Sequence, residues 1–141
     1  TAALGAFGFG YLQDRIGHKR ALGTTLVVWV LMIACAAFAT TRPLFWLAAN
    51  LAGLAMGSSQ SAGRAMVALL SPESRSAEFF SFWNMSLWVA AIVGPLAYGS
   101  VTWITGNDHR LAILVTGVFF LLSIAALMPI SLERGRRAAG R

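Results

Sequence analysis

The sequence predicts an all-α membrane protein, an antiparallel bundle of transmembrane helices, and three observations carry this prediction. First, 57% of the 141 residues are hydrophobic and only 11% are charged, with a mean hydropathy of +0.70. A soluble domain has about 25% charged residues, so this chain lacks the side chains to cover itself in water. Second, its uncharged stretches reach the roughly 20 residues that a helix needs to cross the hydrocarbon core. Third, its Lys and Arg residues cluster between these stretches.

Uncharged stretches and polar segments alternate along the chain. Residues 1–13 are too few to cross a bilayer, so we expect the end of a truncated transmembrane helix there. A polar loop is expected at residues 14–20, and a disordered basic tail at residues 132–141. Between them we expect four complete spans within residues 21–131, at about 21–41, 43–70, 78–105 and 111–131. Their connections are short, so neighbouring spans must run antiparallel.

Positive charge is distributed unevenly between the two ends of these spans. If the spans alternate in direction, one side receives only Arg42 and Arg110. The other side receives Arg15, Lys19, Arg20, Arg75, Arg134, Arg136, Arg137 and Arg141. Cytoplasmic loops carry such an excess of Lys and Arg, so we expect the polar loop and the tail in the cytoplasm. Nucleic-acid binding would need a basic exposed face instead, so the expected partner is the lipid bilayer and no nucleic acid.

Residues that could carry catalysis are scattered. The two histidines, His18 and His109, are expected on opposite sides of the membrane, and the five acids lie in separate loops and helix ends. The single cysteine, Cys35, lies inside an apolar stretch and is expected to be a packed side chain. The sequence shows no paired carboxylates, nucleophile–base set, metal-ligand spacing or phosphate-binding loop. We therefore expect no catalytic residue, no metal and no cofactor, and a protein that is not an enzyme.

One polar segment between two apolar stretches carries a recognisable motif. Residues 10–20 read Gly-Tyr-Leu-Gln-Asp-Arg-Ile-Gly-His-Lys-Arg. Gly10 would let two helices approach closely, and Gly17 would supply the permissive backbone of a tight turn. Asp14 could pair with Arg15 or cap the N-terminus of a neighbouring helix. The segment resembles the signature loop of the major facilitator superfamily, G-x-L-x-D-R-x-G-R-K/R. The other interpretation is an ordinary basic loop between two helices.

The resemblance implies a role for this segment. In that superfamily the loop acts as a latch that stabilises one face of the alternating-access cycle. The implied cytoplasmic latch consists of Gly10, Asp14, Arg15, Gly17, Lys19 and Arg20. His18 stands where the superfamily usually has Arg, so one charge of the segment depends on pH.

The second half of the chain narrows the resemblance. Four segments are similar to the C-terminal region of the autophagy-related vacuolar effluxer family and its bacterial relatives, namely residues 57–64, 69–72, 77–80 and 94–99. This similarity implies a partial major-facilitator fold, four complete spans plus the end of a fifth, with the missing N-terminal half as a partner. The implied function is secondary active transport of a small-molecule solute, of the efflux type. The implied location is the bacterial inner membrane, as a multi-pass protein.

Two positions depart from that family. The family usually has Ser where this chain has Gly63, and commonly a Gly-Lys pair where it has Leu87 and Trp88. Loss of an intramembrane Lys removes a candidate contact for substrate or ion, so the family's substrate is not carried over. Two alternatives stay open: a drug or metabolite exporter of another branch, and a non-transporting membrane receptor or scaffold with the same fold.

The second complete span carries a stripe of small and polar residues. At spacings of three and four, one helix face holds Asn50, Gly53, Gly57, Gln60 and Arg64. Gly53 and Gly57 form a G-x-x-x-G pair, which predicts close helix packing. Gln60 and Arg64 are candidates for the substrate pathway. Two interpretations of Arg64 stay open, because its side chain could snorkel to the surface or pair with Gln60 or Glu78.

The third span has a similar face. Asn84 and Trp88 lie on it and are candidates for the substrate pathway, although a Trp at this spacing is more often a packing residue. Gly94 and Pro95 are expected to serve helix packing, where they should loosen the backbone hydrogen bonding and permit a kink.

Overall fold

The chain folds entirely into helices over residues 1–140, which are the residues that the computed structural model describes. Arg141, one of the expected cytoplasmic charges, lies outside this range. The elements in chain order are α1 (Ala2–Ile16), α2 (His18–Ala37), α3 (Arg42–Leu70), the short 3-10 helix η1 (Glu73–Arg75), α4 (Ser76–Ile104), α5 (His109–Leu127) and α6 (Leu132–Ala138).

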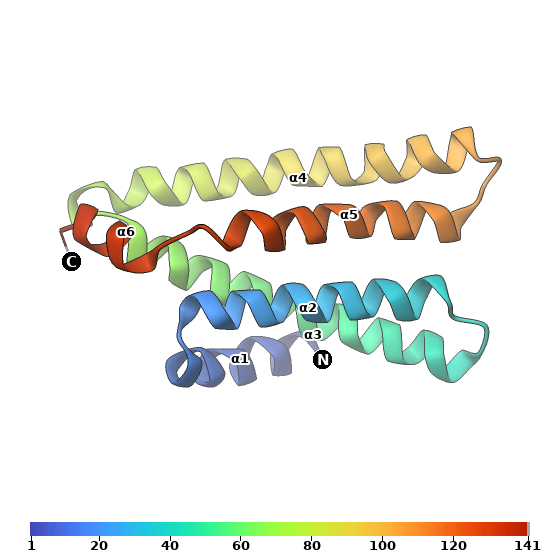
Figure 1. Ribbon diagram of the computed structural model, residues 1–141, viewed down its shortest axis with the longest axis horizontal. Coiled ribbons are helices and arrows are strands. Elements are labelled where there is room, and N and C mark those ends of the chain that lie inside the picture. The colour runs from blue at the N-terminus through green and yellow to red at the C-terminus, as the bar shows by residue number, and fades with distance from the viewer. Residues whose placement is uncertain (141) are drawn as a thin grey trace.

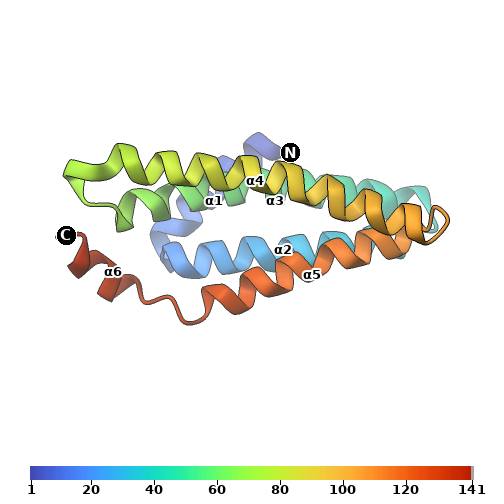
Figure 2. The same ribbon diagram turned by 90° about the horizontal axis from the view of Figure 1, so that it is seen from above.

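Four long helices run along the same axis and alternate in direction (Figures 1 and 2). α2 packs against α3 on one side and α5 on the other, α4 packs against α5, and α1 lies against α3. The turn between α1 and α2, the η1 link and α6 gather toward one end of the bundle, and the other two links lie at the opposite end (Figure 1). Short connections therefore give the antiparallel arrangement that the sequence predicts.

Three of the four expected spans are both long enough and apolar enough to cross a membrane. These are α2, α5 and the continuous stretch Glu73–Ile104 that includes α4. At 29 residues α3 has the length, because a rise of 1.5 Å per residue gives about 44 Å. It is not among the candidate spans, and its polar stripe of Asn50, Gln60 and Arg64 lowers its apolar content.

Residues 14–20 were expected to form a polar loop, but the structure places almost all of them in helices. α1 continues through Asp14 and Arg15 to Ile16, and α2 begins at His18, so only Gly17 breaks the helix. The Gly17 amide donates to the carbonyl of Gln13 at 2.9 Å, and its own carbonyl accepts from Ala21 at 3.0 Å. The polar residues occupy two abutting helix ends, where side chains can be charged while the backbone stays hydrogen-bonded.

The expected disorder of the tail is also wrong. Residues Leu132–Ala138 form α6, and the Ser131 hydroxyl accepts from the Arg134 amide at 3.4 Å at its start. Arg137 and Glu133 form an ion pair of 2.6 Å one turn apart. Gly135 rests against the end of α3, where an added Cβ would lie 2.5 Å from Leu70 Cδ2. Local pairs and one tertiary contact thus order a segment whose composition suggests disorder.

The interior of the bundle consists mainly of small side chains. Fully or almost fully buried are Ala21, Ala37, Ala48, Ala55, Ala62 and Ala112. α4 buries no residue among the described part of the chain, and its large side chains Trp88, Leu96 and Trp103 are exposed. Small residues let helix backbones approach closely, which is how helices pack when lipid surrounds them. The composition of this interior fits a membrane environment.

The backbones of α1 and α3 approach each other closely at three glycines. A Cβ added to Gly5 would lie 2.5 Å from the Leu54 carbonyl oxygen, and one on Gly57 would overlap the carbonyl of Ala2. Gly53 faces the same helix, at Thr1. Both glycines of the G-x-x-x-G pair therefore lie in this contact, together with a third glycine from the opposite helix.

We predict that Gly57→Ala lowers the free energy of unfolding by about 1–3 kcal/mol, the usual cost of overpacking, because its Cβ would collide with backbone. The measurement is denaturant unfolding of a full-length protein that carries this chain, in detergent. Gly8→Ala is the matched control in α1, since its Cβ meets nothing within 4 Å. It should leave stability unchanged or raise it by up to about 1 kcal/mol. Equal effects of the two changes would contradict the packing described here.

Candidate functional site

The turn between α1 and α2 is set by one glycine. Gly17 has φ 86° and ψ 153°, in the positive-φ region where a side chain is strained. The Gln13 side chain is only 3% exposed, and its amide is hydrogen-bonded to the ring of His18 across the turn. Gln13 was not among the expected site residues, and its place one turn before the glycine is the signal that could have indicated a role.

Asp14 and Arg15 do not form the expected ion pair. The Arg15 guanidinium lies 4.7 Å from the centre of the Tyr11 ring and donates to the Tyr11 hydroxyl. Asp14 is exposed, and no hydrogen bond or ion pair joins its carboxylate to another described residue. Tyr11 lies one helical turn before Arg15, so this local contact competes with the adjacent carboxylate. The carboxylate is left open to a partner outside residues 1–140.

Lys19 connects the start of α2 to the end of α5. Its ammonium group donates to the carbonyl oxygens of Met128 and Ile130, at 2.7 and 2.8 Å. The last carbonyls of a helix have no partner within the helix, and a cation there also complements the helix dipole. α5 has no basic residue in its own last turn. This contact joins residues more than a hundred positions apart, so no local sequence pattern predicts it.

Gly10 and Arg20, the other two members of the expected latch, lie in open surroundings. A Cβ added to Gly10 would meet no atom within 4 Å, so the expected close helix approach at Gly10 is not formed within residues 1–140. Arg20 is exposed, and only its backbone carbonyl is engaged, by the Thr24 hydroxyl at 2.9 Å. Within residues 1–140, the motif makes side-chain contacts beyond its own helix through His18 and Lys19. Gly10 has no close neighbour there, and Asp14 and Arg20 are exposed.

The polar stripe of α3 splits between two environments. Gly53 and Gly57 lie against α1, while Asn50 is exposed and donates to the Trp46 carbonyl at 2.8 Å. Gln60 is half-buried and Arg64 is exposed. No hydrogen bond within the described residues joins Arg64 to Gln60 or Glu78, so neither expected pairing is present.

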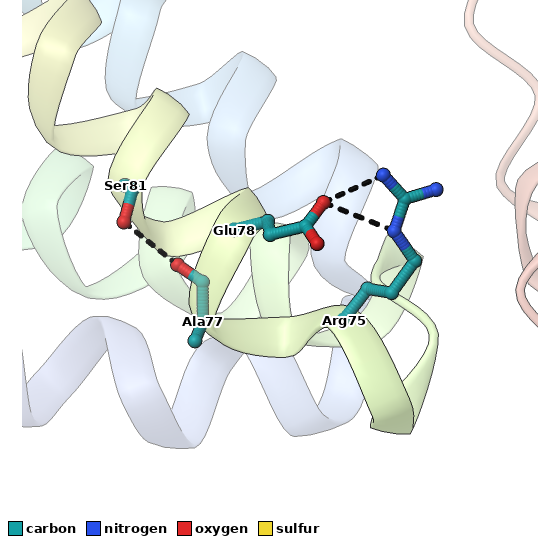
Figure 3. Close-up of polar contacts among 4 residues, drawn as sticks. All are labelled: Arg75, Ala77, Glu78 and Ser81. Carbon is teal, nitrogen blue, oxygen red and sulfur yellow. Dashed lines mark hydrogen bonds and ion pairs between the residues drawn. The ribbon is translucent and has the colours of Figure 1, made fainter.

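Glu78 is occupied by another arginine. Arg75 donates from Nε at 3.0 Å and from Nη2 at 2.6 Å to the same carboxylate oxygen of Glu78, as Figure 3 shows. Nearby, the Ser81 hydroxyl donates to the Ala77 carbonyl at 2.9 Å (Figure 3). An acid in the first turn of α4 complements the helix dipole, so the Arg75–Glu78 pair stabilises the start of this helix. Glu78 thus pairs with Arg75 and not with Arg64.

Asn84, Trp88, Gly94 and Pro95 lie on parts of α4 that other described helices do not cover. Asn84 is exposed, and the Trp88 side chain is 73% exposed. α4 continues through Pro95, and a Cβ on Gly94 would meet nothing within 4 Å, so the expected packing at this pair is not formed within residues 1–140. This surface of α4 is therefore exposed within residues 1–140.

The structure explains why position 63, one of the two departures from the effluxer pattern, is a glycine. It is buried, and an added Cβ would overlap the ring of Trp83, which reaches across from α4. A serine at position 63 could not be accommodated without moving that ring. The Trp83 indole nitrogen is itself buried and has no hydrogen-bond partner among the described residues. The sequence analysis assigned neither residue to this contact.

Two open hollows lie at the ends of the described bundle. No group of three or more His, Cys, Asp or Glu residues in residues 1–140 is placed to hold a metal ion. One open hollow lies at the α2–α3 link, beside Arg42, Phe45 and Trp46. Another lies at the opposite end, between α6 and the turn at Gly17. The pathway candidates Gln60, Arg64, Asn84 and Trp88 line neither hollow.

Comparison with known proteins identifies the family. The Major Facilitator Superfamily profile matches residues 1–140. The uncharacterized MFS-type transporter YxiO of Bacillus subtilis is 29% identical over 119 residues, covering 84% of this chain and 28% of the relative. Autophagy-related protein 22 of Cryptococcus neoformans is 36% identical over 87 residues, 62% of this chain and 16% of the relative. The niacin transporter NiaP of Acinetobacter baylyi is 30% identical over 146 aligned positions, 95% of this chain and 31% of the relative.

No solved structure gives a significant match. The chain spans less than a third of the length of each of these curated relatives. Both resemblances that the sequence indicates, to the superfamily and more distantly to the vacuolar effluxers, are confirmed by these matches. The superfamily consists of membrane transporters and not of enzymes, so the chain is part of a multi-pass integral membrane protein that belongs to the Major Facilitator Superfamily.

Proposed function

We propose that the protein carrying this chain moves a small solute across a membrane by alternating access, in the efflux direction. The match of the superfamily profile to residues 1–140 is the observation that carries the proposal. In this mechanism two halves rock about a site near the membrane midplane. The named relatives include a niacin transporter and autophagy-related proteins, so they do not agree on a solute, and we name none.

The proposed membrane arrangement has four crossings, made by α2, α3, α4 and α5, in the bacterial inner membrane. α3 is included because it is as long as α4 and antiparallel to its neighbours α2 and α4. α1 would be the end of a further span. The uncovered face of α4 supports a binding partner in the remaining half of the same polypeptide, or lipid.

Asp14 is the proposed cytoplasmic latch. Its carboxylate is exposed, and Arg15 is held by Tyr11, so Asp14 is available to a cation or a helix N-terminus elsewhere in the protein. Gly17 shapes the turn, and Lys19 fixes that turn to the end of α5. A latch of this kind would hold one of the two states closed and open when the partner moves.

The proposed solute pathway includes Gln60 and Arg64 on α3 and Asn84 and Trp88 on α4. These two helices are in contact, and three of the four side chains are exposed in the described chain. A polar or charged group in a transmembrane helix is costly unless it faces a partner or a watery cavity, which supports placing Arg64 on such a cavity. Trp88 would add an apolar wall to it.

We predict that inverted membrane vesicles containing the full-length protein show protein-dependent flux of a small solute, found by screening organic solutes and cations. Asp14→Asn should lower the flux rate about tenfold, equivalent to about 1.4 kcal/mol, because it removes the latch charge. The amount of protein inserted in the membrane should be unchanged. A receptor or scaffold with this fold would give no protein-dependent flux.

The matched control is Asp108→Asn, at the opposite end of the bundle. Asp108 accepts from the Leu111 amide at 3.0 Å as the N-cap of α5, and Asn caps a helix equally well. Its flux should equal that of the wild type. If Asp14→Asn also transports at the wild-type rate, Asp14 is no latch, although the transport proposal itself would stand.

Lys19 is predicted to stabilise the bundle and not only to carry positive charge. Lys19→Met keeps most of the aliphatic chain but removes the donor to the carbonyls of Met128 and Ile130, so the free energy of unfolding should fall by about 1–2 kcal/mol. Denaturant titration in detergent measures this change. The neighbouring Arg20→Met removes the same charge without a side-chain contact in residues 1–140 and should have little effect. Equal losses from both would refute a specific role for Lys19.

A further inference from the structure

A basic hollow lies between α6, the turn at Gly17 and the end of α3. It has a volume of about 490 Å³ and is open on one side. Its lining combines two kinds of side chain, the apolar Leu69 and Leu132 and the polar His18, Glu133, Arg136 and Arg137. The hollow is thus apolar in one part and cationic in another. The solute pathway proposed above does not use it, and of the latch residues only Gly17, whose backbone shapes the turn, lies in its lining.

Tertiary contacts hold α6 in place beside the bundle. Gly135 faces Leu70 closely enough that a Cβ would lie 2.5 Å from Leu70 Cδ2. Lys19 also binds the carbonyls of Met128 and Ile130 in the segment that leads into α6. These contacts seat α6 against the helix ends, so its arginines are displayed at a fixed position beside the hollow.

Positive charge is left over in the hollow. Arg137 is paired with Glu133 at 2.6 Å, which leaves no acid for Arg136 among the lining residues. Arg136 is exposed and makes no ion pair with another residue in the part of the chain described. Arg134, on the same short helix, adds a further exposed cation. An anion placed here would meet the unpaired guanidinium of Arg136 and that of Arg137, which is already paired with the Glu133 carboxylate.

The hollow lies close to where the membrane surface must be. α5, a candidate span, ends at Leu127, and α6 begins only five positions later, at Leu132. Basic pockets at the cytoplasmic ends of transmembrane helices attract the phosphate of acidic lipids. Arg binds phosphate through several parallel hydrogen bonds. The apolar residues Leu69 and Leu132 suit the glycerol and first methylene groups of a lipid better than a free anion.

We propose that this hollow binds the headgroup phosphate of an anionic phospholipid, with Arg136 as the principal donor and Arg137 as the second. Leu69 and Leu132 contact the apolar part of the same lipid. The proposal requires the helix ends to lie at a membrane surface, and it does not depend on solute, direction of transport or the latch. A bound acidic lipid would also join α6 to the start of α2 and the end of α3, since residues from all three helices line the hollow.

The test is native mass spectrometry of the full-length protein, purified in micelles with equal amounts of phosphatidylglycerol and phosphatidylcholine. Wild-type protein should retain phosphatidylglycerol preferentially. Arg136→Gln, which keeps the Arg137–Glu133 pair, should weaken that preference about fivefold, and Arg136→Gln with Arg137→Gln should abolish it. Replacing both arginines by Lys should preserve most of it. Arg110→Gln, a cation at the opposite end of the bundle, is the matched control and should retain the wild-type preference.

Two results would overturn the proposal. One is equal retention of both lipids by the wild type, and the other is an unchanged preference in the Arg136→Gln and double variants. A further arm adds inorganic phosphate to the wild-type protein in the same mixed micelles, at the concentration of the phosphatidylglycerol. Failure of phosphate to displace phosphatidylglycerol supports a lipid site, whereas displacement at equal concentration would make it a site for free anions. Monodisperse protein with the wild-type melting temperature shows that each variant is folded, and solute flux read in parallel separates this result from the transport proposal.

Discussion

Backbone hydrogen bonding in hydrocarbon is the constraint on which this structure depends. A peptide group exposed to lipid without a partner costs several kcal/mol, so a chain crossing the bilayer must satisfy its backbone internally, and a helix does so. The constraint is hardest to meet where helices end. Gly17 meets it by letting α2 begin immediately after α1. Lys19 meets it for α5 by donating to the carbonyl of the C-cap residue Met128, and it also binds the carbonyl of Ile130 in the link to α6. The residues of the superfamily motif thus have a structural task before any functional one.

Small residues pack closely on one side of the bundle, whereas the helix surface on the other side is exposed. α1 and α3 approach through Gly5, Gly53 and Gly57, and the remaining interior is largely alanine. On α4 most of the large side chains are exposed instead, whereas Trp83 fills the space that Gly63 leaves on α3. The pathway candidates lie on α3 and α4. A transporter whose site forms between two halves would leave such surfaces uncovered in either half alone.

Periodicity and charge predict the helices of this chain well, because both are local properties of the sequence. The helical class, the direction of the long helices and the need for glycine at position 17 follow from them. Contacts between distant residues do not. Lys19 binds carbonyls at and beyond the end of α5, and the ring of Trp83 occupies the space beside Gly63. Gly135 of α6 lies against Leu70. No local sequence pattern contains these contacts. Asp14 shows that a local pattern can also suggest a contact that does not form. Its neighbour Arg15 could have paired with it, but Arg15 contacts Tyr11 instead.

The crossing of α3 is the central claim, because it decides whether both ends of the bundle lie on the sides that the charges indicate. Single cysteines at Thr40, Ser74 and Asn107, in a Cys35→Ser background, can be labelled with a membrane-impermeant maleimide in intact cells. Four crossings predict labelling at positions 40 and 107 and protection at 74 until the membrane is permeabilised. If α3 did not cross, positions 40 and 74 would react alike, and the proposed topology, latch side and lipid site would all have to be abandoned.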